Sequence, residues 1–439
     1  MKNKIKFNNI FIFLILISVA FSCQSDDDMP TETPISVSFE VIISEGNTLR
    51  VLANNTSTGI GGLNSYWQFT ENGEVVADQA GPEMYLYSAS GDYLITLTVE
   101  APNGDIQSSQ TITITGEDYV PPALKDATSS FSVGMAVRSN RLTGQHNEVL
   151  VRDFNNITAE YEMKMDQIFK AENNMDFTAS DKIVDYGIAN SMDIHGHTLI
   201  WHNATPTWVE NFSGTNAEFE TMIETYITTV VKRYAGKVRS WDVVNEAVED
   251  GSNSLRNSVF KLKMGDDYIE KCYQFARNAD PNALLFYNDY NITFDAGKQA
   301  SVFALVDDLK SKNLIDGIGA QMHISIDFPT KAQIESVVNG TISRGLLIHF
   351  SELDVRVNPN NDITSLTEER EIAQQNKVKE VVEIYDAIPN ANKFAITIWG
   401  MRDSESWLPD FWGNPEWALL YDDDFKPKKA HNGFLEALD

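Results

Sequence analysis

Eight apolar runs between residues 131 and 399 have the length and composition of buried strands, and stretches with helical periodicity separate them. The predicted strands are Phe131–Val137, Met175–Phe177, Ile194–Trp201, Ser240–Asn245, Leu284–Asn288, Gly317–Ile324, Leu346–Val355 and Phe394–Trp399. The predicted helices include Ala217–Tyr234, Asp266–Asn278, Ala300–Ser311 and Glu368–Ile388. This alternation predicts an α/β fold, a (β/α)8 TIM barrel over residues 125–439. A doubly wound sheet is the alternative, but the Gly-rich phosphate turn typical of that fold is missing.

Residues 35–117 have a different pattern, in which short alternating runs are separated by Gly, Asn and Ser turns. The expected strands are Val37–Ile43, Leu49–Ala53, Tyr66–Phe69, Tyr93–Val99 and Thr111–Ile114. They predict a small immunoglobulin-like β-sandwich, which resembles the polycystic-kidney-disease-type modules of secreted bacterial hydrolases. Trp67 lies inside an alternating strand, so we expect it in the core of the sandwich. Residues 118–124 include Val120-Pro121-Pro122 and form the expected linker.

The first 22 residues have three lysines followed by an apolar run that is short for a membrane span, which is typical of a signal peptide. Ser22-Cys23 resembles the lipobox of bacterial lipoproteins, so we expect lipidation of Cys23; a plain signal peptide is the alternative. Residues 23–34 form an acidic tether that resembles the surface-export signal of Gram-negative lipoproteins. We therefore expect an outer-membrane surface lipoprotein, attached through a lipid anchor.

The charge of the chain excludes an ordinary nucleic-acid binder. It carries 34 Lys plus Arg against 63 Asp plus Glu, a net charge of −29, which could not neutralise a phosphate backbone. The 2 cysteines, Cys23 and Cys272, cannot form a disulfide framework or a cysteine zinc site. We expect a monomer with no nucleic-acid partner.

Carboxylates and amides follow several of the predicted barrel strands. Glu246 follows Ser240–Asn245, and Glu352 and Asp354 end the run that begins at Leu346. In a barrel, such strand ends form the active-site face. Two glutamates at that face suit glycoside hydrolysis, in which one protonates the leaving oxygen and the other attacks the anomeric carbon. Structural ion pairs are the alternative interpretation.

These strand ends resemble those of glycoside hydrolase family 10, the retaining endo-β-1,4-xylanases, and the resemblance covers residues 125–439. The motifs that carry it are Gly196-His197-Thr198-Leu199-Ile200-Trp201-His202, Trp241 to Glu246, Asn288-Asp289-Tyr290-Asn291, Asp316 to His323, Ser351-Glu352-Leu353-Asp354 and Trp399-Gly400-Met401-Arg402-Asp403. The resemblance implies an extracellular polysaccharide as substrate and internal cleavage. The chemistry needs no cofactor or metal.

By this resemblance, Glu246 is the acid/base and Glu352 the nucleophile. Asn245 would bind the 2-hydroxyl at the cleavage point, and His323, held by Asp354, would orient Glu352. The retaining mechanism predicts a separation of roughly 5 to 5.5 Å between the two catalytic carboxyl groups.

The expected sugar-binding residues are Glu160, Tyr161, Lys164, His197, Trp201, Ala204, Tyr290, Gln321, Trp399 and Trp407. Trp412 and Trp417 are expected to serve as packing or loop anchors. A zinc site built from His195, His197 and His202 is a weaker alternative, because His202 falls on the opposite side of the strand.

Two positions depart from the family pattern. The helix after the first strand typically begins Thr-x-Glu-Asn-x-x-Lys, and here Tyr161 replaces the asparagine. Ala204 stands where a glutamine is usual. A site that loses polar partners discriminates differently between hydroxyl patterns, so the substrate is in question while the reaction is not. Xylan is the expected substrate; the alternatives are an algal galactan such as porphyran, a mixed-linkage xylan, or a non-catalytic glycan-binding role.

Overall fold

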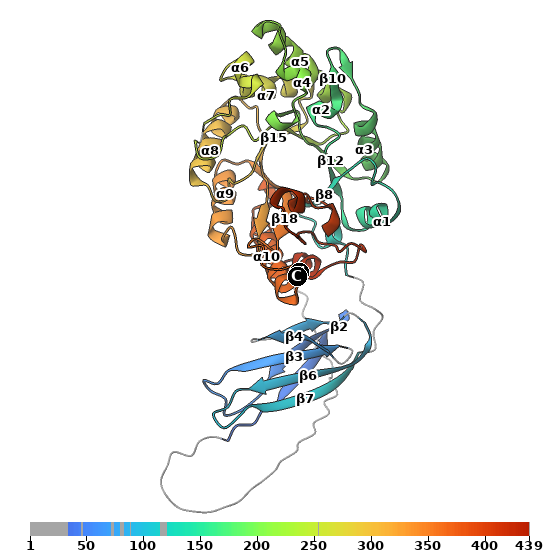
Figure 1. Cartoon of the computed structure of the whole chain (residues 1–439), viewed down its shortest axis with the longest axis vertical. Coiled ribbons are helices and arrows are strands. Elements are labelled where there is room, and N and C mark those ends of the chain that lie inside the picture. Colours follow the sequence, from blue (N-terminus) through green and yellow to red (C-terminus); the bar gives the residue numbers. More distant parts are fainter. Residues whose placement is uncertain are drawn as a thin grey trace, which may run out of the picture. The chain divides into compact units, whose positions relative to one another are not determined.

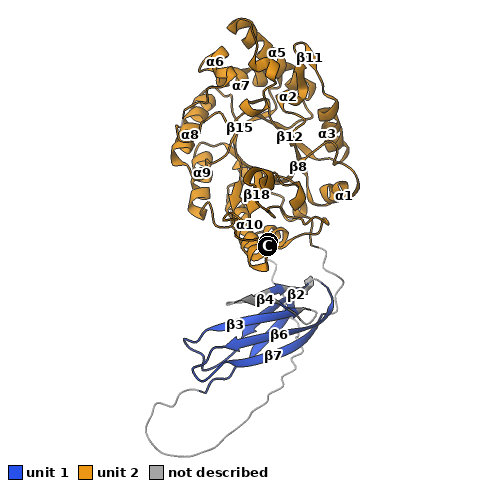
Figure 2. Cartoon of the chain, viewed as in Figure 1, with its two compact units in different colours: residues 1–120 blue, residues 121–439 orange. Residues whose placement is uncertain are grey.

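The computed structural model describes residues 34–44, 47–71, 74–79, 83–87, 89–114, 121–252 and 254–438. The expected signal peptide, Cys23 and nearly all of the acidic tether lie outside these residues. The chain divides into two compact units, residues 1–120 and 121–439, which Figure 2 colours separately. Among the described residues, no helix is long and apolar enough to cross a membrane.

The first unit contains two antiparallel sheets, with strand orders β1-β2-β5 and β4-β3-β6-β7. Their strands are β1 (Phe39–Ser44), β2 (Asn47–Asn55), β3 (Ser65–Glu71), β4 (Glu74–Gln79), β5 (Glu83–Leu86), β6 (Gly91–Val99) and β7 (Ile106–Ile114). Trp67 is 2% exposed and lies edge-on to Phe39, so it packs in the core between the sheets. Strands β4 and β5 were not predicted from the sequence.

The second unit is a closed barrel of eight parallel strands in the described part of the chain. The strands are β8 (Ser132–Val137), β9 (Asn156–Ala159), β12 (Asp193–Gly196), β14 (Ser240–Asn245), β15 (Leu284–Asp289), β16 (Gly317–Ala320), β18 (Leu347–Arg356) and β19 (Lys393–Ile398). The barrel closes because β19 pairs with β8 in parallel, with Ile398 opposite Met135. The predicted TIM barrel is confirmed.

Helices surround the barrel strands (Figure 1). They are α1 (Gly144–Asp153), α2 (Met165–Ile168), α3 (Thr178–Ala189), α4 (Thr207–Glu210), α5 (Asn216–Arg233), α6 (Val259–Met264), α7 (Tyr268–Ala279), α8 (Ala296–Ser311), α9 (Lys331–Ser343), α10 (Glu368–Asp386), α11 (Leu408–Trp412) and α12 (Lys429–Glu436). The short strands β10 (Phe169–Ala171), β11 (Asn174–Met175), β13 (Ile200–Trp201) and β17 (His323–Ser325) complete the unit, with short 3-10 turns at Leu124–Asp126, His202–Ala204, Asn390–Asn392 and Asp403–Glu405.

Helix α5 shows how the sequence specifies these outer elements. It begins with a capping box, in which Thr215 accepts a hydrogen bond from the backbone of Glu218 and Glu218 bonds back to Thr215. Phe219, Ile223 and Tyr226 then follow at helical spacing, and all are fully buried. The buried stripe faces the barrel, so the cap sets where the helix begins and the stripe sets how it packs.

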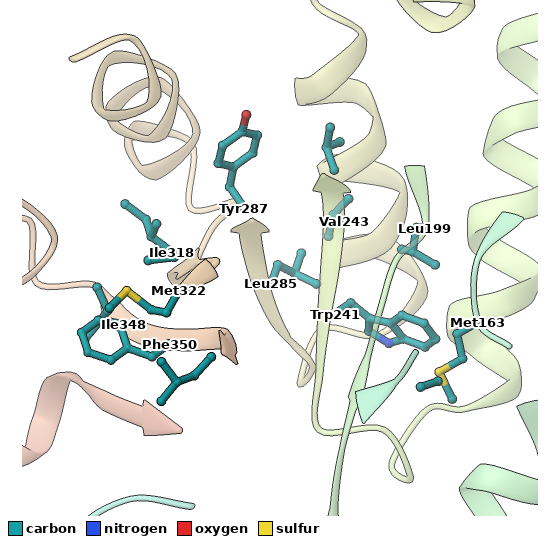
Figure 3. Close-up of a cluster of buried hydrophobic side chains, with 14 of the residues drawn as sticks. Met163, Leu199, Trp241, Val243, Leu285, Tyr287, Ile318, Met322, Ile348 and Phe350 are labelled. Carbon is teal, nitrogen blue, oxygen red and sulfur yellow. The ribbon is translucent and has the colours of Figure 1, made fainter. Parts of the chain in front are cut away.

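Alternation along the strands separates the core from the site. Trp241, Val243, Leu285 and Tyr287 lie in the hydrophobic cluster drawn in Figure 3, on strands β14 and β15. In β15 the intervening Phe286 and Asn288 point to the other face, which in a barrel is the interior. In β14 the register shifts between Asp242 and Val244, which places Asn245 opposite Asn288. Gly196 permits the dense packing, because a Cβ there would lie 2.1 Å from a ring carbon of Trp241.

One predicted strand is wrong. The second barrel strand is Asn156–Ala159, whereas Asn174–Met175 is half of a two-stranded antiparallel hairpin outside the barrel sheet. As a consequence, Glu160, Tyr161 and Lys164 lie in the turn after β9 and not on a helix after the first strand. The tetrapeptide Asn-Ile-Thr-Ala has a single large apolar residue, so it lacks the apolar run by which the other strands were found.

Candidate active site

Glu246 follows directly on β14 and has an unusual backbone. Its φ is +54°, a left-handed conformation that is uncommon for glutamate. Its amide donates to the carbonyl of Asn288 at 2.9 Å, and its carbonyl accepts from Nε of Arg256 at 2.9 Å. These two hydrogen bonds stabilise the left-handed backbone conformation at the end of the strand.

Glu246 is 8% exposed, and its carboxyl group accepts hydrogen bonds from neutral donors. Nε1 of Trp201 lies 2.8 Å from Oε2, and Nε2 of Gln321 lies 3.1 Å from Oε1. Burial and the charge of Asp289 raise the pKa of Glu246 to about 7, although the hydrogen bonds oppose this. A carboxyl group with this pKa is protonated below neutral pH and can serve as an acid.

Glu352 lies on β18 and is 5% exposed, but its hydrogen-bond donors differ from those of Glu246. Oε1 accepts from Nδ2 of Asn288 at 2.8 Å, and Oε2 lies 3.2 Å from Nε2 of His323. Burial alone would raise the pKa of Glu352, but the hydrogen bond from His323 is the first of several effects that together bring it below the ordinary value. This carboxyl group is therefore ionised in the same range in which Glu246 is protonated.

His323 connects Glu352 to a second carboxylate. Its Nδ1 lies 2.8 Å from Oδ2 of Asp354, and the same oxygen accepts from Nε1 of Trp407 at 2.9 Å. Burial lowers the pKa of His323, but the charge and hydrogen bond of Asp354, together with Glu352, raise it to about 10. The imidazolium donates to both carboxylates, and Asp354 fixes its orientation.

A chain of side-chain amides lies between the two glutamates. Asn288 donates to Asn245 Oδ1 at 3.0 Å as well as to Glu352, and Gln321 donates to the same Asn245 oxygen at 3.2 Å. Ser351 donates to Oδ1 of Asn288 at 2.6 Å. Nδ2 of Asn245 also lies 3.3 Å from Oε1 of Glu246, so the network connects the two carboxyl groups through Asn245 and Asn288.

The turn after β9 brings Glu160, Tyr161 and Lys164 to the same end of the barrel. Glu160 accepts two hydrogen bonds from Arg138, both at 2.6 Å. Tyr161 is 41% exposed, and its ring contacts both Arg138, at 4.5 Å, and the ammonium of Lys164, at 4.7 Å. The Lys164 ammonium also lies 4.8 Å from the Trp201 ring, so cation–π contacts continue from Tyr161 to the tryptophan that binds Glu246.

Aromatic rings and imidazoles surround the glutamates. Trp399 lies 5.4 Å from His197 and 6.5 Å from His323, and Trp407 lies 4.9 Å from His323. Tyr290 is further out, where its hydroxyl donates to Asp250 at 2.7 Å and accepts from Arg256 at 2.7 Å. Ala204 is buried, with 4% of its surface exposed.

His195 and His197, two of the three histidines of the zinc alternative, share a carboxylate partner. Nδ1 of His197 and Nε2 of His195 lie 2.9 Å and 3.0 Å from the same oxygen of Asp242. Within the part of the chain that the structure describes, no group of three His, Cys, Asp or Glu side chains is arranged to hold a metal ion.

Residues 123–437 match the model of Glycosyl hydrolase family 10. The chain belongs to this family.

The chain is similar to endo-beta-1,4-xylanase Xyn10C of Cellvibrio japonicus, with 36% identity over 372 residues that cover 77% of this chain and 61% of the relative. It is also similar to endo-1,4-beta-xylanase B of Paenibacillus barcinonensis, with 34% identity over 71% of this chain and 96% of the relative. Native xylanase 10B from Thermotoga maritima has a similar structure, with a TM-score of 0.68 and 34% identity over 72% of this chain and 98% of that one. The chain thus spans less than two thirds of the first of these relatives and nearly all of the second.

In this family 10 domain, several residues of the site were not predicted from the sequence. Asn288 was only part of a motif, yet it contacts Glu352 and Asn245. Asp289 is fully buried against Lys298, at 2.8 Å, and it is the carboxylate that most affects the pKa of Glu246. Arg138 follows β8 and binds Glu160. All three are polar residues at the end of a barrel strand, a signal that was used for the glutamates and could have found them.

Proposed function

We propose that this protein is a retaining endo-1,4-β-xylanase, with Glu246 as the acid/base and Glu352 as the nucleophile. The observation that carries the proposal is the opposite environment of the two glutamates. Glu246 is surrounded by neutral donors and has its pKa raised to about 7, whereas Glu352 accepts from the His323 imidazolium and Asn288. Two carboxyl groups with separated pKa values are the requirement of this reaction.

In the first step, an ionised oxygen of Glu352 attacks the anomeric carbon while the proton of Glu246 passes to the leaving oxygen. The glycosidic bond breaks, and a glycosyl ester on Glu352 remains. In the second step, Glu246, now ionised, takes a proton from water, whose oxygen displaces Glu352 from the anomeric carbon. Asn245 and Gln321 supply the polar contacts for the sugar at the cleavage point.

The similarity to proteins that are named as xylanases supports xylan as the substrate. Tyr161 supports a second candidate, a β-linked glycan other than plain xylan. Its exposed ring takes the place of an amide, and Arg138 occupies both oxygens of Glu160. Fewer polar groups in this turn remain for sugar hydroxyls, which changes the preferred hydroxyl pattern.

Product sizing after parallel incubation with xylan, β-glucan and porphyran tests these candidates. We expect short xylo-oligosaccharides from xylan. Products from porphyran alone would overturn the xylanase proposal while retaining the two glutamates. Proton NMR of the first anomer released tests the mechanism, and inversion of configuration would contradict the role of Glu352.

We further propose that Cys23 is lipidated and that the N-terminal β-sandwich, as a polycystic-kidney-disease-like module, is part of a cell-surface lipoprotein. The support is the order of an apolar segment, Cys23 and an acidic run in the sequence. Fractionation of cells that produce the full chain or its Cys23→Ser variant tests the anchor. The native chain is expected in membranes, and equal membrane association of the variant would contradict lipidation.

A further inference from the structure

Helix α11 presents two aromatic side chains to solvent. Phe411 is 64% exposed and Trp412 is 51% exposed, so Trp412 is not packed in the core. They continue a row that begins at Trp407, with ring centroids 5.0 Å apart between Trp407 and Phe411 and 5.1 Å apart between Phe411 and Trp412. Adjacent exposed aromatic rings are unfavourable in water unless something covers them, which points to a binding surface.

The row starts within the catalytic machinery. Trp407 donates to Asp354 at 2.9 Å and its ring lies 4.9 Å from His323, the residue that contacts Glu352. A polysaccharide held at Glu352 would pass Trp407 and reach the outer rings next. This continuity favours the substrate chain as the occupant.

The side chain of Arg356 packs against the ring of Trp412 and supports it. The guanidinium of Arg356 lies 4.2 Å from the ring of Trp412, and its Nε donates to Glu416 at 3.0 Å. Glu416 is 4% exposed, and its other oxygen accepts from the backbone of Val357 and Asn358. An ion pair between a buried carboxylate and a partly buried guanidinium, with these additional hydrogen bonds, is a rigid support. The exposure of Trp412 is therefore built into the fold.

The residue that supports Trp412 and the proposed nucleophile lie on the same strand. Glu352, Asp354 and Arg356 are alternate residues of β18, and they contact His323, Trp407 and Trp412 respectively. Side chains two residues apart on a strand point the same way. The position of the aromatic row is thus fixed relative to the nucleophile.

We propose that Phe411 and Trp412 form an additional sugar-binding surface, on which a β-1,4-linked polysaccharide chain extends from the catalytic glutamates. The inference rests on the proposed glycoside hydrolase function. The apolar C–H faces of the sugar rings would stack on the two aromatic rings, as apolar faces do on π-systems. The surface would increase the affinity for long chains and leave the cleavage chemistry unchanged.

The test compares Phe411→Ala, Trp412→Ala and the double variant with Leu262→Ala. Leu262 is 61% exposed on α6 and controls for the loss of an exposed apolar side chain. We expect kcat/KM on polymeric xylan to fall roughly three- to tenfold for each aromatic variant, and kcat/KM on an aryl xylobioside to stay constant. The control should match the native protein on both substrates.

Binding is measured separately, by the retardation of Glu352→Gln protein in gels that contain xylan. Adding Phe411→Ala and Trp412→Ala should reduce the retardation. Unchanged retardation and unchanged polymer kinetics would overturn the inference and leave the rings as a surface for another partner. An equal loss on the aryl xylobioside would also overturn it. If the native protein hydrolyses no substrate, the proposed function fails, while the gel still decides whether the rings bind xylan.

Discussion

The side-chain amide of Asn288 donates a hydrogen bond of 2.8 Å to Oε1 of Glu352. The same nitrogen lies 3.0 Å from Oδ1 of Asn245, so Asn288 aligns the proposed nucleophile with a residue beside the acid/base. This alignment depends on the neighbouring strand. At Gly319 of β16, a Cβ would lie 2.3 Å from Oδ1 of Asn288.

Gly319→Ala should therefore lower kcat by moving Asn288. We expect at least about a tenfold loss of kcat, because a misplaced catalytic group stabilises the transition state less. Overpacking should cost about 1–3 kcal/mol of stability. Steady-state kinetics and thermal melting measure the two effects. Gly61→Ala is the control, because nothing lies within 4 Å of its added Cβ. Native kcat in Gly319→Ala would show that the contact is dispensable.

Glu352→Gln should abolish hydrolysis and preserve binding. The amide keeps the size of the side chain but cannot form the glycosyl ester, so we expect kcat to fall by at least about a thousandfold. Activity on xylan and retardation in a xylan gel measure catalysis and binding independently. Normal turnover by this variant would refute the assignment of the nucleophile and favour the non-catalytic interpretation.

The activity should have a bell-shaped pH dependence. Glu246 must be protonated to act as an acid, so activity should fall as the pH rises past its pKa of about 7. Glu352 must be ionised, so activity should fall on the acid side as the pH drops through its lowered pKa. A profile of kcat/KM against pH on an aryl xylobioside checks both limbs.

Asp289→Asn should shift only the basic limb of the profile of kcat/KM against pH. Removing this carboxylate leaves the ammonium of Lys298 nearby and lowers the pKa of Glu246. We expect the basic limb to shift by about one unit toward lower pH. The measurement is the same pH profile, and a fixed basic limb would show that Asp289 does not set the pKa of Glu246.

Asp354→Asn should impair catalysis through His323. The loss of a charge-assisted hydrogen bond of about 1.5–3 kcal/mol corresponds to roughly a 10- to 100-fold fall in kcat. With less positive charge on His323, the pKa of Glu352 should rise, so the acid limb should move to higher pH. Asp308→Asn, at an exposed ion pair on α8, is the matched control. An unchanged acid limb would contradict this role of Asp354.

Tyr161→Asn should change selectivity more than turnover. The asparagine restores an amide of the family pattern, and one hydrogen bond to a sugar hydroxyl is worth about two- to tenfold in affinity. We expect KM for xylo-oligosaccharides to fall by that factor with kcat nearly constant. Comparing xylan with β-glucan measures selectivity; a loss of xylan activity would instead show that the tyrosine ring binds the sugar.

The sequence by itself determined the barrel and predicted the two glutamates as its catalytic residues. Apolar runs separated by helical stretches predict alternating strands and helices with a parallel sheet, and the missing Gly-rich phosphate turn favours a closed barrel over a doubly wound sheet. Glu246 and Glu352 could be found because a carboxyl group after an apolar strand is costly unless it is paired or used. The amphipathic stripe and capping box of α5 likewise follow from local spacing.

The tertiary structure decided what local pattern could not. Asn156–Ala159 is a strand because β8 and β12 pair with it on both sides, although its own sequence contains one large apolar residue. The charge that most affects Glu246 comes from Asp289, and the exposure of Trp412 depends on the support of Arg356 beneath it. These are relations between residues far apart in the chain. Hydrophobic periodicity specifies the elements that carry it and their buried faces, whereas distances between side chains on different strands are fixed only when the barrel closes.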